Sequence, residues 1–146
     1  MDNSQMQIIF QLILALILGA VMGLERERKN KGAGFKTYSL VSLGACLFTI
    51  VALNSFSLFT GEAGISFDPS RIIMAVATGI GFIGAGIIIF HKDHIKGTTT
   101  AAGLWCVAAI GAAIGIKLYL LACFASILVL IILALFGVLE RKVFKK

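Results

Sequence analysis

Long runs of apolar residues, separated by short polar segments, make up most of this chain. A helix needs about 20 apolar residues to cross a hydrocarbon core of about 30 Å. Three runs of this kind lie in the first 90 residues, and we expect helices over residues 7–24, 37–56 and 71–90. Charged residues occur at the edges of these runs and not in their interiors. The pattern therefore predicts membrane-spanning helices.

The next apolar stretch, residues 98–139, is too long for one span. As a single helix its 42 residues would extend about 63 Å, twice the thickness of the hydrocarbon core. Gly115 and Lys117 mark the expected turn, which divides the stretch into helices over residues 98–116 and 118–139. A re-entrant fourth segment is the main structural alternative, because its residues are small and weakly hydrophobic. The fold class predicted is an all-α polytopic membrane protein with about five spans.

The basic residues indicate how these spans are oriented. If loops alternate between the two sides, 11 of the 13 Lys and Arg residues fall on one side, and only Arg71 and Lys117 fall on the other. Cytoplasmic loops carry the excess of Lys and Arg in membrane proteins. An odd number of spans then places the N-terminus outside and the C-terminus in the cytoplasm.

Composition supports one membrane domain over residues 1–146. Hydrophobic residues make up 59% of the chain, charged residues 14%, and the mean hydropathy is +1.00. No polar stretch approaches the about 50 residues that an independent soluble domain needs. The net charge of +6 does not indicate nucleic-acid binding, because the basic residues flank apolar runs and do not form a solvated face.

Small residues predict which helices pack closely, since helices in lipid associate where their backbones can approach. The predicted packing positions are in the first, third and fourth spans: Gly19, Gly23, Gly79, Gly81, Gly84, Gly86, Gly103, Gly111 and Gly115. We expect these three spans to be central and the fifth, with large side chains on all faces, to be peripheral. The same small-residue faces suggest a homo-oligomer, with a dimer as the simplest form. Residues 79–86 also resemble a glycine-rich phosphate loop, but such loops need water and a preceding strand.

The chain shows no pattern for catalysis or for a cofactor. No nucleophile and base stand in a recognisable arrangement, so no enzymatic activity is expected. His91 and His94, with Asp93 between them, would bind a metal only if another helix supplied ligands, and the simpler interpretation is a solvated loop. The cysteines Cys46, Cys106 and Cys123 lack metal-type spacing and are interpreted as small hydrophobic residues. We therefore predict no metal and no cofactor.

The charged residues at the span ends allow two interpretations each. Glu25 and Glu27 either pair with Arg26 or Arg28, or with basic groups on a neighbouring helix end, or they form a solvated charged collar. Arg71, close to Asp68, is either an interfacial arginine or part of a buried pair.

The sequence also indicates which residues begin the third and fourth helices. Asp68 and Pro69 favour a start of the third helix near Pro69. Thr98, Thr99 and Thr100 are expected to cap the fourth helix with their hydroxyl groups. A helix N-terminus beside Lys92 and Lys96 is also a hypothetical anion site.

Four segments together resemble the MgtC/SapB family of bacterial inner-membrane proteins. They are Gly23-Leu24-Glu25-Arg26-Glu27 with Ala33-Gly34-Phe35-Lys36-Thr37; Asp68-Pro69-Ser70-Arg71; the run from Gly79 to Gly86; and the run from Gly97 to Trp105. Their order and spacing are similar to the family's membrane domain from about Gly19 to Gly115. Lys36 stands where arginine is more usual. We also expect the chain to lack the soluble C-terminal domain of virulence-associated members.

The resemblance implies five spans in the bacterial inner membrane and a role in adaptation to low magnesium and in survival inside host cells. It also implies a regulator of other membrane proteins, such as the proton-translocating ATP synthase. The absence of carboxylates inside the spans agrees, because a Mg²⁺ pathway normally requires them.

We expect a non-catalytic membrane protein that acts by binding another membrane protein or itself during ion stress; the alternative is a small oligomeric cation channel or transporter. The polar site residues predicted are Glu25, Arg26, Glu27, Lys36, Asp68, Arg71, Thr98, Thr99, Thr100 and Trp105.

Overall fold

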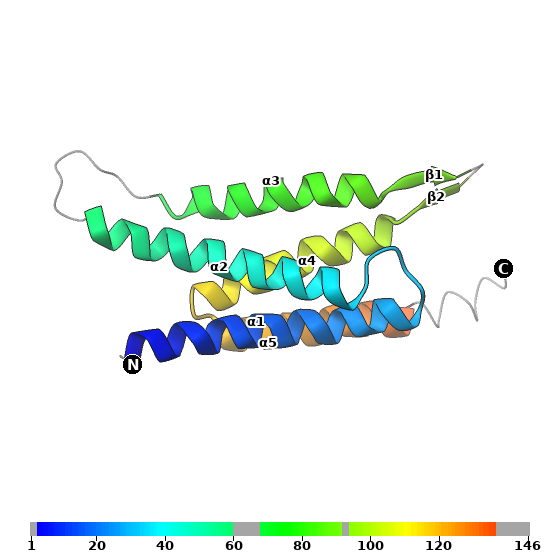
Figure 1. Ribbon diagram of the computed structural model, residues 1–146. Coiled ribbons are helices and arrows are strands. Elements are labelled where there is room, and N and C mark those ends of the chain that lie inside the picture. The colour runs from blue at the N-terminus through cyan, green and yellow to red at the C-terminus, as the bar shows by residue number, and fades with distance from the viewer. Residues whose placement is uncertain (1–2, 60–67, 92–93, 137–146) are drawn as a thin grey trace.

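Five antiparallel helices form an elongated bundle in the computed structural model, which describes residues 3–59, 68–91 and 94–136 (Figure 1). The elements are α1 Asn3–Arg28, α2 Phe35–Phe59, α3 Ser70–Ile87, β1 Ile89–His91, β2 His94–Lys96, α4 Thr98–Gly115 and α5 Tyr119–Ile131. A π-helical turn, η1 Ile132–Phe136, continues α5. Each of the five helices, α5 together with η1, is long and apolar enough to cross a membrane. The prediction of five spans is confirmed.

The connection between α4 and α5 is the tight turn that the sequence predicts. Lys117 lies in the left-handed region, with φ of 66°, and the backbone N–H groups of Lys117 and Leu118 donate to carbonyls of α4. α4 itself is an unbroken helix of 18 residues, so the re-entrant alternative for the fourth segment is wrong. The last three residues predicted for the fifth span, 137–139, lie outside the described residues.

The segment between α3 and α4 differs from the prediction. α3 ends at Ile87, three residues earlier than expected, because residues 89–91 and 94–96 pair as a short antiparallel hairpin. Phe90 pairs with Ile95, and His91 pairs with His94. Strands of three residues are too short to show a clear alternation of apolar and polar positions. The sequence shows only an apolar run followed by a polar loop, so it predicts a longer helix there and no hairpin.

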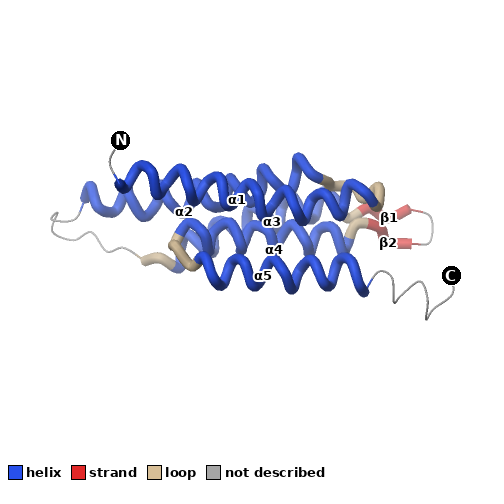
Figure 2. The backbone as a smooth tube through the Cα atoms, turned by 90° about the horizontal axis from the view of Figure 1, so that it is seen from below, coloured by secondary structure: helices blue, strands red, loops and turns tan. Residues whose placement is uncertain are grey.

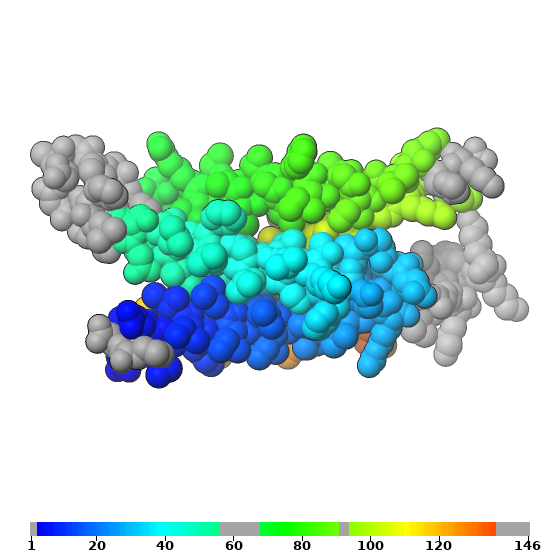
Figure 3. Space-filling model, in the orientation of Figure 1, coloured from blue at the N-terminus to red at the C-terminus, as the bar shows by residue number. Residues whose placement is uncertain are grey.

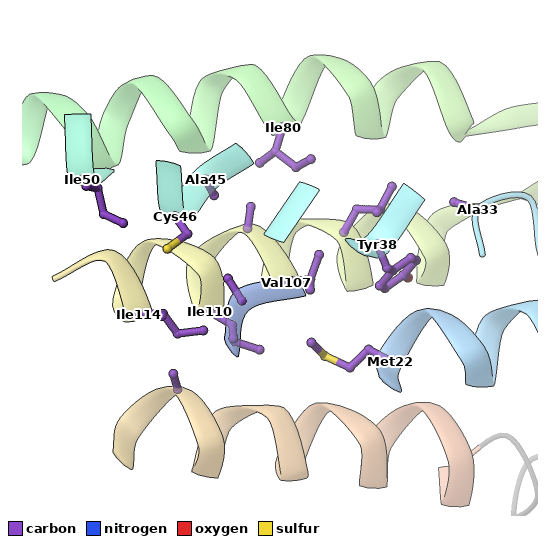
Figure 4. Close-up of a cluster of buried hydrophobic side chains, with 14 residues drawn as sticks. Met22, Ala33, Tyr38, Ala45, Cys46, Ile50, Ile80, Val107, Ile110 and Ile114 are labelled. Carbon is purple, nitrogen blue, oxygen red and sulfur yellow. The ribbon is translucent and has the colours of Figure 1, made fainter. Parts of the chain in front are cut away.

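α4 is the central helix of the bundle and contacts each of the other four (Figures 1 and 2). α2 packs against α1 on one side and α4 on the other. The largest fully buried side chains, among them Tyr38, Met22 and Leu104, lie where these three helices meet. Figure 4 shows Met22, Tyr38 and Val107 converging there from α1, α2 and α4.

Close packing around α2 depends on glycines of α1 and α4. A Cβ atom added at Gly19 would lie 2.7 Å from the carbonyl oxygen of Tyr38, and one at Gly115 would lie 2.6 Å from Cβ of Thr49. Gly23, Gly103 and Gly111 likewise face the backbone or side chains of α2 too closely for any larger residue. These five glycines therefore occupy packing positions, as predicted, and their common partner is α2.

The prediction that the third span is central is wrong. Within α3 only Ile80 and Gly84 are buried, and a Cβ added at Gly84 would lie 3.5 Å from Cβ of Ala101, which is an ordinary contact distance. A Cβ added at Gly79, Gly81 or Gly86 would meet no atom within 4 Å. The second span, which carries one glycine, is central instead. Small residues show where a close approach is possible, but not whether a neighbour within the same chain makes it.

Candidate functional site

The last turn of α1 carries a buried cation paired with a carboxylate. Arg26 is only 3% exposed, and its Nε donates to Oε2 of Glu25 at 2.7 Å. Lys29 Nζ lies 2.5 Å from the other oxygen of the same carboxylate. The basic groups also lie at the C-terminus of α1, where the helix dipole favours positive charge. Glu25 and Arg26 are therefore a packed ion pair rather than a solvated collar.

This arrangement leaves positive charge in excess at a desolvated position. Arg26 and Lys29 share the single carboxylate of Glu25. The Nη1 of Arg26 is buried and has no hydrogen-bond partner within the described residues. Removing one partner of a buried pair typically costs about 3 to 5 kcal/mol, because the remaining charge is left uncompensated. Glu25 is thus required to keep Arg26 in this position.

Tyr38 connects α2 to α4 beside this pair. The side chain is fully buried, and its hydroxyl donates to the backbone carbonyl of Thr100 at 3.1 Å. The hydroxyl lies against Gly103, where no Cβ would fit. A buried tyrosine hydroxyl needs such a partner, since an unpaired one would pay its full desolvation cost.

Glu27 links the end of α1 to the start of α2. Its Oε2 accepts a hydrogen bond from the backbone N–H of Phe35 at 3.0 Å, which satisfies one of the free donors at the N-terminus of α2. Gly34 lies directly against this carboxylate, so a Cβ there would collide with it. Lys29, just after the end of α1, makes a link to η1: its Nζ donates to the carbonyl of Leu133 at 2.8 Å.

We call Glu25, Arg26, Glu27, Lys29 and Tyr38 the basic-end cluster, because they join α1, α2, α4 and η1 at the end of the bundle that carries most of the basic residues. Glu25, Arg26 and Glu27 were predicted from the sequence. Tyr38 and Lys29 were not. The available signal for Tyr38 was a phenolic hydroxyl inside an apolar run, which requires a buried partner.

At the opposite end of the bundle, Arg71 does not form a buried pair. Its side chain is 85% exposed and its Nε lies 3.9 Å from Oδ2 of Asp68. Asp68 instead accepts from the backbone N–H of Ser70 at 2.9 Å and from the Ser70 hydroxyl at 2.7 Å. These hydrogen bonds hold the pKa of the Asp68 carboxyl below its ordinary value. They also start α3 directly after Pro69, as predicted.

The prediction that threonine hydroxyls cap α4 is wrong. The N-cap residue is Gly97, with φ of 93°, and no side chain caps the helix. Thr98 and Thr99 are exposed, and Thr100 is buried with its carbonyl bound to Tyr38. Lys36, Lys96 and Trp105 are exposed and lie outside the cluster. Lys92, the other residue of the hypothetical anion site, lies outside the described residues.

Among the described residues, no group of three His, Cys, Asp or Glu side chains is placed to hold a metal ion. His91 and His94 lie opposite each other in the β1–β2 hairpin, and Asp93 falls outside the described part. The cysteines are free thiols: Cys46 is buried, Cys106 is half-buried and Cys123 is exposed on α5.

Comparison with known proteins identifies the family. The chain is 41% identical over 140 residues to YhiD of Escherichia coli K12, which is named as a candidate magnesium transporter; the match covers 96% of this chain and 65% of that protein. It is 41% identical over 126 residues to protein SapB of Bacillus subtilis, covering 86% of this chain and 54% of SapB. Protein MgtC of Brucella abortus is 36% identical over 121 residues, covering 83% of this chain and 48% of MgtC.

The chain thus spans about half to two thirds of the length of these relatives. No solved structure matches it. The model of the MgtC family matches residues 12–142, which include four of the five helices entirely and most of α1. This chain belongs to the MgtC family.

Proposed function

We propose that this chain is a non-catalytic protein of the bacterial inner membrane that acts during adaptation to low magnesium by associating with another membrane protein. The main supporting observation is where the charged and polar side chains lie in the bundle and which groups they bond to. In the described helices, charged side chains lie only at the helix ends, and between them the side chains of Gln11, Thr49 and Ser126 bond to backbone within the bundle.

The interior amides and hydroxyls stabilise the helices themselves. Gln11 Nε2 donates to the carbonyls of Ile114 and Gly115, at 2.7 and 2.9 Å, in the last turn of α4. Thr49 and Ser126 each donate to the carbonyl four residues earlier in their own helix. Such groups leave little capacity for a passing ion.

Two buried hydroxyls, those of Ser42 and Tyr119, have no hydrogen-bond partner within the described helices. Gly19 and Gly111 close on Ser42 from α1 and α4, and Tyr119, at the start of α5, packs its ring against that of Phe10. A Mg²⁺ ion takes an octahedral oxygen shell and releases its waters reluctantly. A lone hydroxyl between two close-packed helices does not offer that shell, so we favour a role other than transport through one protomer.

The partner follows from the family resemblance. The resemblance implies a regulator of other membrane proteins, such as the ATP synthase, and we propose a partner of that kind, with a homodimer as the oligomeric form. Gly81 and Gly86 on α3 have no atoms within 4 Å of a Cβ position, which gives a partner helix room to approach.

Magnesium transport is the second candidate, favoured by the name of the E. coli relative. In that case the pathway would lie between copies of the chain, lined by backbone of α3. The two functions differ in what the purified protein does alone in a bilayer.

The test is Mg²⁺ uptake into liposomes loaded with a fluorescent magnesium indicator, under an inward Mg²⁺ gradient and an inside-negative potential. The proposal expects uptake equal to that of protein-free liposomes. Co-reconstitution with the ATP synthase supplies the positive arm, in which the chain is expected to change ATP-driven proton pumping. Saturable, protein-dependent Mg²⁺ uptake that is lost in the Gly81→Leu variant would establish the transporter instead.

A further inference from the structure

An apolar groove of about 860 Å³ separates α2 from α3. Its walls include Leu40, Gly44 and Phe48 from α2 and Ile72, Gly79 and Ile83 from α3, and Ala108 of α4 contributes to its floor. In Figure 3 the yellow atoms of α4 are visible between α2 in cyan and α3 in green. The groove is therefore a lateral opening on the side of the bundle that would face lipid.

Small residues keep this groove open. A Cβ added at Gly44 or at Gly79, which face it from opposite walls, would meet no atom within 4 Å. α3 is attached to the bundle mainly through α4, where Gly84 faces Ala101. Because α2 and α3 both rest on α4 and barely touch each other, a space remains between them.

Only one end of the groove carries a charge. Arg71, in the first turn of α3, is a lining residue, and its side chain is 85% exposed. Asp68 beside it is engaged by two hydrogen bonds from Ser70 and lies 3.9 Å from the Arg71 Nε. Apart from Thr37 near the other end, the other lining residues are apolar.

We propose that this groove binds one acyl chain of an anionic glycerophospholipid, with the lipid phosphate at Arg71. From Arg71 to Ile83 the groove follows α3 for about 18 Å. One acyl chain spans half of the hydrocarbon core, or about 15 Å, so the groove accommodates it from the interface inward. The guanidinium provides the planar set of donors that favours a phosphate.

A helix from a second copy fits these features less well. It would need an opening along the whole of α3, but near Ile87 that helix is closed against the start of α4, with Gly97 in direct contact with it. A single cation at one end of a hydrocarbon-lined groove matches the asymmetry of a lipid, which has one charged end. The inference concerns a site separate from the proposed function and does not depend on it.

The test measures quenching of tryptophan fluorescence by phospholipids brominated in the acyl chain. Trp105 is the chain's one tryptophan, so Trp105→Phe gives a silent background into which Phe48→Trp introduces a reporter in the groove wall. Met74→Trp is the matched control. Met74 is exposed and lies outside the groove lining. It is 13 residues from the end of α3, and Phe48 is 13 residues from the start of α2. Because these two helix ends lie at the same end of the bundle (Figure 1), both reporters lie at similar depth in the membrane.

Both brominated lipids are used at low mole fraction. The reporter at position 48 is expected to be quenched about five-fold more effectively by brominated phosphatidylglycerol than by brominated phosphatidylcholine. This is the preference that one arginine near an anionic lipid headgroup would produce. The reporter at position 74 should not distinguish the two lipids. Arg71→Gln should remove the preference at position 48. Gly79→Leu should reduce quenching there, whereas Gly81→Leu, which also enters open space but lies outside the lining, should not.

Equal quenching of both reporters by both lipids would overturn the proposal. So would a preference at position 48 that survives Arg71→Gln, because the phosphate would then not be recognised by this arginine. Protection of position 48 from every brominated lipid, relieved by dilution of the protein in the bilayer, would assign the groove to a second copy of the chain and would also overturn it.

Discussion

α3 and α4 are both rich in glycine, of equal length and both apolar, yet they are used in opposite ways. In α4, Gly103, Gly111 and Gly115 lie against α2 at distances that no side chain would permit. In α3, Gly79, Gly81 and Gly86 face open space. The first set closes the bundle, and the second leaves one side of it available.

The charged residues show the same contrast between the two ends of the bundle. Arg26 is buried and held by Glu25, whereas Arg71 is exposed and only loosely associated with Asp68. A buried pair contributes to stability mainly by avoiding an unpaired charge, while an exposed pair contributes little. The side of the protein formed by α3 and Arg71 therefore combines open space beside its glycines with a charge that is not buried.

The glycine comparison gives the largest expected effect. Gly111→Leu should destabilise the protein by at least about 3 kcal/mol, because the new side chain must displace the backbone of α2 at Ser42. Gly81→Leu, on the open face of α3, should change stability by less than about 1 kcal/mol. Thermal unfolding in detergent, followed by circular dichroism, measures both. Equal losses in the two variants would show that α3 is packed as closely as α4.

The ion-pair comparison gives a smaller effect. Glu25→Gln keeps the shape of the side chain but leaves Arg26 and Lys29 without a counter-charge. Such a change typically lowers the free energy of unfolding by about 3 kcal/mol. We expect a somewhat smaller loss here, because the amide oxygen can still accept a hydrogen bond. Asp68→Asn should leave the melting temperature nearly unchanged, since both Asp68 and its partner Arg71 are exposed. The same melting experiment applies. Identical melting temperatures for Glu25→Gln and the unaltered protein would show that the basic-end cluster is solvated.

The spans could be predicted from the sequence because their signal is local. About 20 consecutive apolar residues have few alternatives to a membrane helix, and Asp68-Pro69 and Gly115 to Lys117 are local start and turn signals. The packing order of the helices could not be predicted in this way. It depends on which glycine face finds a neighbour, and the glycines of α3 and α4 look alike in the sequence.

The candidate site was predictable in part for the same reason. Glu25, Arg26 and Glu27 are charges at a span end, and such charges stand out. Tyr38 and Lys29 act through partners 62 and 104 residues away, at Thr100 and Leu133, so no local pattern identifies them. Thr98 and Thr99 have the composition of a helix cap, but the left-handed Gly97 at the N-cap takes that position instead.

Labelling of Cys46 by a charged, water-soluble thiol reagent tests most directly whether the bundle is closed. Cys46 lies in the core between α2 and α4, next to the Gly115 contact, and is completely buried. With Cys106→Ala and Cys123→Ala it is the single thiol, and Arg28→Cys in a Cys46→Ala background supplies an exposed control. The account predicts that in liposomes position 28 reacts rapidly and Cys46 does not react until the protein is unfolded. Reaction of Cys46 in the folded protein at a rate near that of the control would reveal an aqueous path through the helices and would contradict the account.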